Sequence, residues 1–248
     1  SPSGLSLEDS LDYLKTEIRK ILTSEVEAIG IGVPSVVDAS LGIVYNAANI
    51  PSWKEVHLKD YLSKEFGIPV YVNNDCNCFV LGEKNYGKGK ANRDIVGITL
   101  GTGVGSGLIF DNKLYNGRNT GAGEIGSLPY LDATLEDYCS SLFFARHYHT
   151  TGEELARRAY DGDILSMEIW KKFGVHMGNL MLAVLYVYDP ELIILGGGIS
   201  KAYLLFESEM RKTMEQFPYP ETIKNVRIEI SENKDISLLG ASALANSI

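Results

Sequence analysis

A glycine-rich segment, residues 100–107 (Leu-Gly-Thr-Gly-Val-Gly-Ser-Gly), does most to limit the folds open to this chain. It lies between apolar runs at 95–100 and 107–110 that are typical of buried strands. It lacks the Gly-Lys-Ser/Thr ending of a P-loop, and it continues as a strand where a dinucleotide-binding motif would open a helix. Its backbone N–H groups are still open to close approach by phosphate. An ordinary glycine-rich hairpin explains the spacing equally well.

The rest of the chain alternates short apolar runs with longer segments of helical periodicity, which indicates an α/β protein. Helices are predicted from the spacing of apolar residues at 7–21, 58–66, 76–86, 135–147, 152–160, 164–188 and 237–245. Strands are predicted at 29–33, 68–72, 95–100, 107–110, 113–115, 192–195 and 226–230. Residues 87–92 are polar and glycine-rich, and they mark a boundary between two lobes.

Composition and charge exclude several classes of protein. The net charge of −9 argues against nucleic acid or an anionic membrane surface as the main partner. The three cysteines suggest a reducing compartment, and the polar, acidic N-terminus does not resemble a signal peptide. The most apolar helical stretch, 180–188, is too short to span a bilayer. The expectation is a soluble cytoplasmic protein.

The sequence Asn73-Asn74-Asp75 follows a predicted strand, where α/β proteins commonly place ligand-binding groups. A carboxylate at this position could accept the proton of an attacking hydroxyl. The alternative is that Asp75 only caps the helix that follows it.

Three further polar residues are candidates for a binding site. Glu124 lies in a Gly-Glu-Ile-Gly turn, and its alternative is an ordinary surface loop. Glu136 lies near a helix start, where the helix dipole favours an acid in any case. Asn49 belongs to a predicted turn that includes Trp53, which either walls a pocket or simply packs.

No metal site is predicted from the cysteines and histidines. Cys76 and Cys78 form a C-x-C pair, but no second nearby pair completes a tetrahedral zinc site. Two histidines in an H-x-H pattern, His147 and His149, do not share a helix face.

Taken in order, these segments resemble the ROK family of sugar kinases and sugar-responsive repressors. The matching stretches are 30–34 with Asp38 and Gly42, 49–53, 74–75 with 81–83, 100–107, 123–126, 135–136 and 195–199. The resemblance implies an actin-like (ribonuclease H-like) fold of two lobes with the ligands between them. It also implies an N-terminal lobe of residues 1–93, a C-terminal lobe of residues 94–235 and a terminal helix, about 236–248, that packs back on the first lobe.

The resemblance also assigns roles to individual residues. Asp75 matches the general base, and the positions that contact the sugar are Asn49, Asn74, Glu124 and Glu136. The second phosphate loop corresponds to Gly101, Thr102, Gly103 and Gly105, and the adenosine side corresponds to Gly196, Gly197 and Gly198. The implied nucleotide is ATP, with Mg²⁺ bridging its phosphates.

The chain departs from the family pattern at three points. It has no Asp-x-Gly-Gly-Thr phosphate motif, and it starts after the unit that carries that motif, which would span roughly 25–40 residues. Ser127 replaces the usual histidine of Glu-Ile-Gly-His, and the cysteine cluster that normally follows is replaced by a short loop at 127–134. No structural zinc is therefore expected, and the first lobe is expected to lack its N-terminal strands.

The resulting prediction is an ATP-dependent kinase that acts on a hexose or an N-acyl hexosamine. It is expected to be a homodimer and to have neither nucleic acid nor a membrane as a partner. The alternatives are a sugar-sensing transcriptional regulator and a catalytically inactive sugar-binding protein on the same fold.

Overall fold

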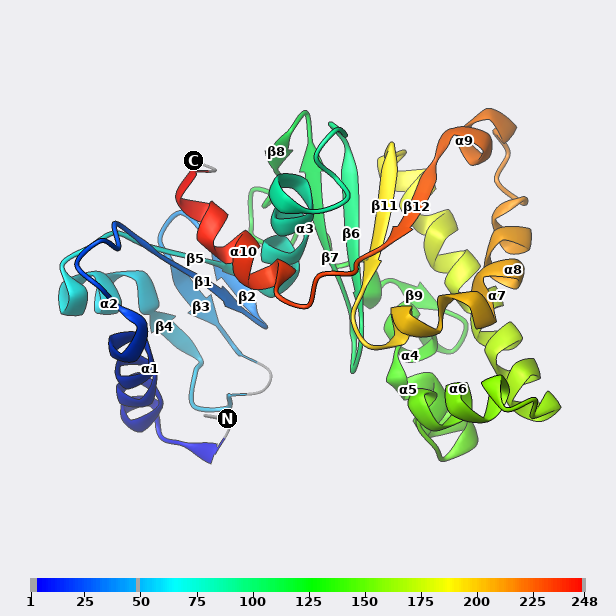
Figure 1. Cartoon of the computed structure of the whole chain (residues 1–248), viewed down its shortest axis with the longest axis horizontal. Coiled ribbons are helices and arrows are strands. Elements are labelled where there is room, and N and C mark those ends of the chain that lie inside the picture. The colour runs from blue at the N-terminus through cyan, green and yellow to red at the C-terminus, as the bar shows by residue number, and fades with distance from the viewer. Residues whose placement is uncertain (1–3, 48–49, 247–248) are drawn as a thin grey trace.

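The computed structural model describes residues 4–47 and 50–246. Its helices are α1 (Leu7–Ile21), α2 (Leu58–Phe66), α3 (Asp75–Tyr86), α4 (Leu135–Cys139), α5 (Ser141–Tyr148), α6 (Gly152–Tyr160), α7 (Ile164–Tyr188), α8 (Tyr203–Met214), α9 (Pro220–Asn225) and α10 (Ile236–Ala243), with short 3₁₀ turns η2 (Ile125–Ser127), η3 (Ile199–Ala202) and η4 (Leu244–Asn246). Its strands are β1 (Ile29–Val33), β2 (Val36–Asp38), β3 (Ile43–Tyr45), β4 (Glu55–His57), β5 (Val70–Asn74), β6 (Ile95–Leu100), β7 (Val104–Phe110), β8 (Lys113–Leu114), β9 (Pro129–Tyr130), β10 (Ala133–Thr134), β11 (Leu192–Gly196) and β12 (Arg227–Ile230). They form the two-lobed arrangement of Figure 1.

The N-terminal lobe is built on two small sheets. Strand β1 runs parallel to β5, with Val33 opposite Asn74, and in the described chain β1 has no other strand partner. Strands β2, β3 and β4 form an antiparallel sheet of their own. Helices α1 and α2 lie beside these sheets and contribute Leu11, Ile18, Leu58 and Leu62 to one buried apolar cluster (Figure 1).

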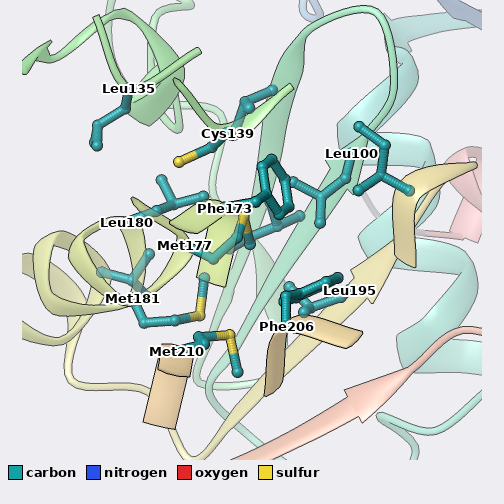
Figure 2. Packing of buried hydrophobic residues seen from close by; sticks show 14 of the residues in the cluster. Leu100, Leu135, Cys139, Phe173, Met177, Leu180, Met181, Leu195, Phe206 and Met210 are labelled. Atoms are coloured by element: carbon teal, nitrogen blue, oxygen red, sulfur yellow. The ribbon is translucent and has the colours of Figure 1, made fainter. Parts of the chain in front are cut away.

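The C-terminal lobe has a five-stranded sheet in the order β12-β11-β6-β7-β8. Strand β11 runs parallel to both neighbours, whereas β6 and β7 are antiparallel. Because side chains alternate along a strand, Ile193 and Leu195 of β11 face one core while Leu192 and Ile194 face another. Figure 2 shows the first of these cores, where Leu100 and Leu195 of the sheet meet Phe173 and Met177 of α7.

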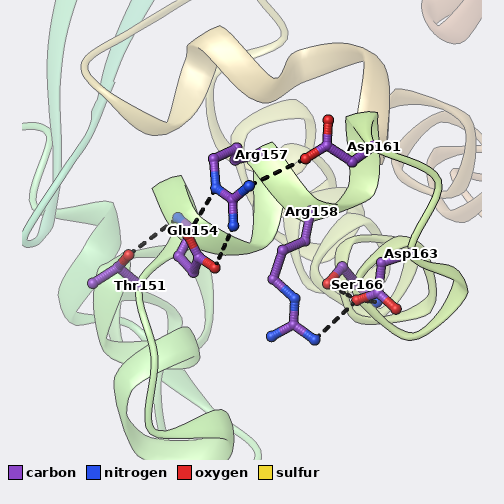
Figure 3. A network of polar contacts seen from close by, with 7 residues as sticks. All are labelled: Thr151, Glu154, Arg157, Arg158, Asp161, Asp163 and Ser166. Carbon is purple, nitrogen blue, oxygen red and sulfur yellow. Dashed lines mark hydrogen bonds and ion pairs between the residues drawn. The ribbon is translucent and has the colours of Figure 1, made fainter.

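Thr151 is the N-cap of helix α6, and its hydroxyl accepts a hydrogen bond from the Glu154 N–H at 3.2 Å. Asp163 caps α7 by accepting from the Ser166 N–H, and Arg158 pairs with Asp163 (Figure 3). These caps satisfy backbone donors that a helix start leaves free. They also fix the start of α6 beside a cavity described below.

Helix α10 returns to the N-terminal half of the chain and lies against α3 and β1 at very short range (Figure 1). A methyl group built on Gly240 would fall 1.7 Å from the Cys78 carbonyl oxygen, and one on Gly82 would fall 2.0 Å from the Ile236 oxygen. One built on Gly30 of β1 would fall 1.8 Å from the Ala241 oxygen. Glycine at these three positions lets backbone pack directly on backbone.

The structure corrects several predicted elements. The helix predicted at 135–147 is two helices, because Ser140 adopts an extended conformation and its side chain caps α5. The predicted short loop at 127–134 contains a hairpin of β9 and β10. Strand β7 begins at Val104, so most of the predicted glycine loop is strand and only residues 101–103 form the turn. The small sheet of β2, β3 and β4 was not predicted, because its strands have three residues each.

No helix in the described part of the chain is long and apolar enough to cross a membrane.

Candidate functional site

Asp75 is the first residue of α3 and follows directly on β5, at the carboxyl end of the strand. The cap of α3 is Asn74, whose side-chain oxygen accepts from the N–H groups of Cys76 at 2.8 Å and Asn77 at 3.3 Å. The Asn74 amide nitrogen donates to the Ser35 carbonyl at 3.0 Å. The side-chain capping role considered for Asp75 thus belongs to its neighbour.

Burial raises the pKa of Asp75 above its ordinary value of 3.8, although hydrogen bonds from Cys76 oppose that effect. The Cys76 thiol lies 3.5 Å from the Asp75 carboxylate and 3.1 Å from the Thr99 hydroxyl. Burial, reinforced by the Asp75 charge, raises the pKa of this thiol strongly. Cys76 is therefore a neutral packing group beside the carboxylate, not a thiolate nucleophile.

Three carboxylates from distant parts of the sequence share one electrostatic environment. Glu124 is exposed as a whole residue, yet partial desolvation of its carboxyl group raises its pKa. The negative charges of Glu136 and then Asp75 raise the pKa of Glu124 further. Like charges gathered in this way are characteristic of functional sites, because they cost stability unless a ligand uses them.

The glycine turn lies against one of these carboxylates. The Glu136 Oε2 accepts a hydrogen bond from the Val104 N–H at 2.9 Å. A methyl group on Gly103 would fall 2.3 Å from the same oxygen. Gly103 thus has the close-approach role that the sequence suggested, but toward a carboxylate of the chain itself.

A cavity of about 430 Å³ opens beside the glycine turn. Gly101, Thr102 and Gly198 line this cavity, and the α-carbons of Gly101 and Gly198 face open space. Four other predicted glycines are packed against protein atoms instead. Gly103 lies against Glu136 and Gly105 against Cys76, while Gly196 lies against Phe79 and Gly197 against Leu100. Gly197 also has a φ of +86°, in the left-handed region that favours glycine.

The same cavity brings in residues that sequence reasoning missed. They come from α5, α6, α7 and the turn after β11: Ser141, Thr151, Gly152, Glu153, Ala156, Tyr160, Trp170, Ile199, Lys201 and Ala202. The indole N–H of Trp170 is buried and finds no hydrogen-bond partner in the described chain. No motif joins these residues, so only the fold could reveal them.

A cluster of rings from β9, α4 and α7 contains Tyr130, Tyr138 and His176. Tyr130 of β9 bonds through its hydroxyl to His176 Nδ1 at 3.1 Å, and Tyr138 of α4 lies 4.8 Å from the His176 ring.

Within residues 4–47 and 50–246, no group of three or more His, Cys, Asp or Glu side chains could hold a metal ion. The absence of a structural zinc stays a prediction.

His176 should make folding stability depend on pH. Burial, assisted by nearby His147, lowers the pKa of His176 to about 4, from 6.5 in an unfolded chain. Between these values the unfolded state binds more protons, so stability is lost as pH falls from 6.5 toward 4. Because of this histidine, the free energy of unfolding of the wild-type protein should fall by about 1 kcal/mol between pH 7 and pH 4.5, allowing for partial exposure. In urea unfolding at the two pH values, His176→Gln should not show this fall. The control is His149→Asn at an exposed site, and an unchanged pH slope in the His176 variant would contradict the assignment.

Asn49 lies outside the described residues, so its predicted place in the sugar site stays a prediction.

The two lobes, the paired parallel strands and the glycine turn beside clustered carboxylates define an actin-like fold, which solved structures of sugar kinases share. The chain belongs to the ROK family, whose model matches residues 5–248.

Two relatives and one solved structure illustrate the range of the family. A glucokinase of Thermotoga maritima is 29% identical over 251 residues, covering 89% of this chain and 79% of that protein. A xylose repressor of Caldicellulosiruptor bescii is 28% identical over 250 residues, covering 87% of this chain and 61% of the repressor. A ROK family glucokinase from Streptomyces griseus, solved with glucose and AMPPNP, superposes with a TM-score of 0.81 at 26% identity, covering 96% of this chain and 88% of that one.

Proposed function

We propose that the protein is an ATP-dependent sugar kinase that phosphorylates a hydroxyl of a hexose or an N-acyl hexosamine. The observation that carries this proposal is the gathering of Asp75, Glu124 and Glu136 near a glycine turn that also lines a cavity. The carboxylates offer acceptors for sugar hydroxyls, and the cavity offers space and backbone for a nucleotide.

Asp75 is the proposed general base, which accepts the proton of the sugar hydroxyl as that oxygen attacks. Burial raises its pKa, and a raised pKa makes the carboxylate a stronger base. Glu124 and Glu136 are proposed to accept hydrogen bonds from ring hydroxyls, as carboxylates in partly desolvated sites do well. The Asn74 amide is occupied as a helix cap, so its proposed sugar contact can use only the remaining capacity of that group.

ATP is the proposed donor, and it supplies the phosphoryl group when bound. The residues present fit it at the cavity beside the glycine turn, because Gly101 and Gly198 leave open space over their α-carbons. There the backbone of the turn could approach phosphate oxygens without a side chain intervening. Mg²⁺ would travel with the nucleotide and keep several waters, which requires few protein ligands.

The test is a coupled assay that detects ADP, with glucose, N-acetylmannosamine and N-acetylglucosamine offered in parallel with ATP and Mg²⁺. We expect turnover of at least one sugar, and ATP hydrolysis without sugar serves as the background. No turnover of any of the three, in protein shown to be folded by circular dichroism, would count against the proposal.

The rate should also report the ionisation of the base. Since burial raises the Asp75 pKa, the acid limb of kcat/KM against pH should fall at a pH above 3.8. Activity should be full above that limb and decline as protonation removes the base. Measuring kcat/KM from pH 4 to pH 8 checks this, with coupling enzymes kept in excess throughout. A flat profile across that range would rule out a titrating carboxylate base.

The likeness to a xylose repressor supports a second candidate, a sugar-sensing regulator. A regulator would bind the sugar without needing turnover. Sugar binding by calorimetry together with no ADP formation would favour this candidate over the kinase.

A further inference from the structure

The segment of α4 and α5 contacts the glycine turn at both of its ends. At one end, the Glu136 Oε2 accepts from the Val104 N–H at 2.9 Å. At the other, the Ser141 N–H donates to the Gly101 carbonyl at 2.9 Å. Hydrogen bonds from a single short stretch of chain therefore hold residues 101–103 at both ends of the turn.

The break between the two helices makes the second contact possible. In a continuous helix the Ser141 N–H would bond to the carbonyl four residues earlier. Ser140 is extended, with φ −121° and ψ −171°, and this frees the Ser141 N–H for the turn. The Ser140 hydroxyl then caps the new helix by accepting from the Leu142 N–H at 3.1 Å.

Glu136 is also held firmly on the helix side. Thr134 caps α4, and Asp137 completes a capping box by accepting from the Thr134 N–H at 3.1 Å. Arg146 of α5 pairs with Asp137 and ties the two helices together. Of the two carboxylate oxygens of Glu136, Oε2 is used by Val104, while Oε1 accepts no hydrogen bond from the described residues.

We propose that Glu136 is shared between the sugar site and the glycine turn, and that it couples the binding of sugar and nucleotide. The inference rests on the proposed function: a sugar hydroxyl donates to Oε1 while the Val104 N–H donates to Oε2. A bound sugar then fixes the carboxylate, and the carboxylate fixes the turn on which the nucleotide phosphates lie. Because both ligands stabilise the same arrangement, the coupling is positive, and linkage makes it equal in both directions.

The experiment is calorimetric titration with the best sugar of the panel above, in the absence and presence of saturating AMPPNP and Mg²⁺. We expect AMPPNP to lower the Kd of the sugar by about 10-fold, a typical size for coupling between sites. The reverse titration should show that the sugar lowers the Kd of AMPPNP by the same factor.

Two variants at one position isolate the hydrogen bond. Val104→Pro removes the N–H at the first residue of a strand, where proline is tolerated, and leaves Glu136 in place. Val104→Ala shortens the same buried side chain but keeps the N–H. We expect about 10-fold coupling to persist in Val104→Ala and to fall below about 2-fold in Val104→Pro. If the proline variant does not fold, Gly103→Ala serves instead, because its methyl group displaces the carboxylate from the turn.

The outcomes separate the two proposals. Turnover with independent binding of sugar and AMPPNP would overturn the coupling and leave the kinase intact. Full coupling in both Val104→Pro and Gly103→Ala would overturn the role of Glu136 in it. Failure of the wild-type protein to bind either ligand would overturn the proposed function and this inference with it.

Discussion

Asp75→Asn is expected to lower kcat by about 10²–10⁴-fold, the range that general-base catalysis typically contributes. The amide has nearly the shape of the carboxylate but cannot accept the hydroxyl proton. Since Asn74, not Asp75, caps α3 with its side chain, the substitution removes no helix cap. The fold should therefore survive, and the measurement is kcat with saturating sugar and ATP.

Sugar affinity provides the decisive comparison for this variant. We expect the Kd of the sugar in Asp75→Asn to stay within a few-fold of the wild-type value, because the proposed contacts of Glu124 and Glu136 remain. The matched control is Asp161→Asn, the same chemical change at the exposed end of α6, where only an ion pair with Arg157 is lost. Near-normal turnover by Asp75→Asn would assign the base to another residue.

Gly240→Ala is expected to destabilise the protein by about 3 kcal/mol, at the upper end of the usual cost of overpacking. The new methyl group would lie 1.7 Å from the Cys78 oxygen and 2.7 Å from the Gly82 nitrogen. Both are backbone atoms of α3, so no side-chain rotation relieves the clash and the helices must separate. The gain in helix propensity from glycine to alanine, up to about 1 kcal/mol, offsets only part of this.

Thermal unfolding followed by circular dichroism measures this effect, and a fall of roughly 5–10 °C in Tm is expected. Gly121→Ala is the control, because nothing lies within 4 Å of the methyl group that it would add. A Tm for Gly240→Ala within 1–2 °C of the control would mean that α10 does not pack on α3 as described.

Local pattern was enough to predict most of the regular elements. The spacing of Leu7, Leu11 and Ile18 gave α1, and Gly67 ends α2 in the left-handed conformation expected of a terminal glycine. The family and its actin-like fold also followed from ordered motifs and are confirmed by the family match and the solved relatives. The assigned roles of individual site residues stay predictions.

What sequence could not supply was the set of contacts between elements. No residue near Ser140 indicates a break in the helix, since Leu135 and Phe143 continue an apolar helical pattern. The extended conformation of Ser140 depends on the turn that Ser141 contacts. Likewise, the sequence alone does not distinguish the roles of the glycines in residues 101–107. Only the packing separates Gly101, which faces the cavity, from Gly105, which lies against Cys76.

The return of α10 to α3 and β1 also bears on how the protein is made. A ribosome releases residues 7–86, including Asp75, long before it synthesises residues 236–243. Until then the surfaces of Gly30 and Gly82 that α10 covers have no partner. The N-terminal lobe therefore stays incompletely packed until the entire C-terminal lobe has been synthesised.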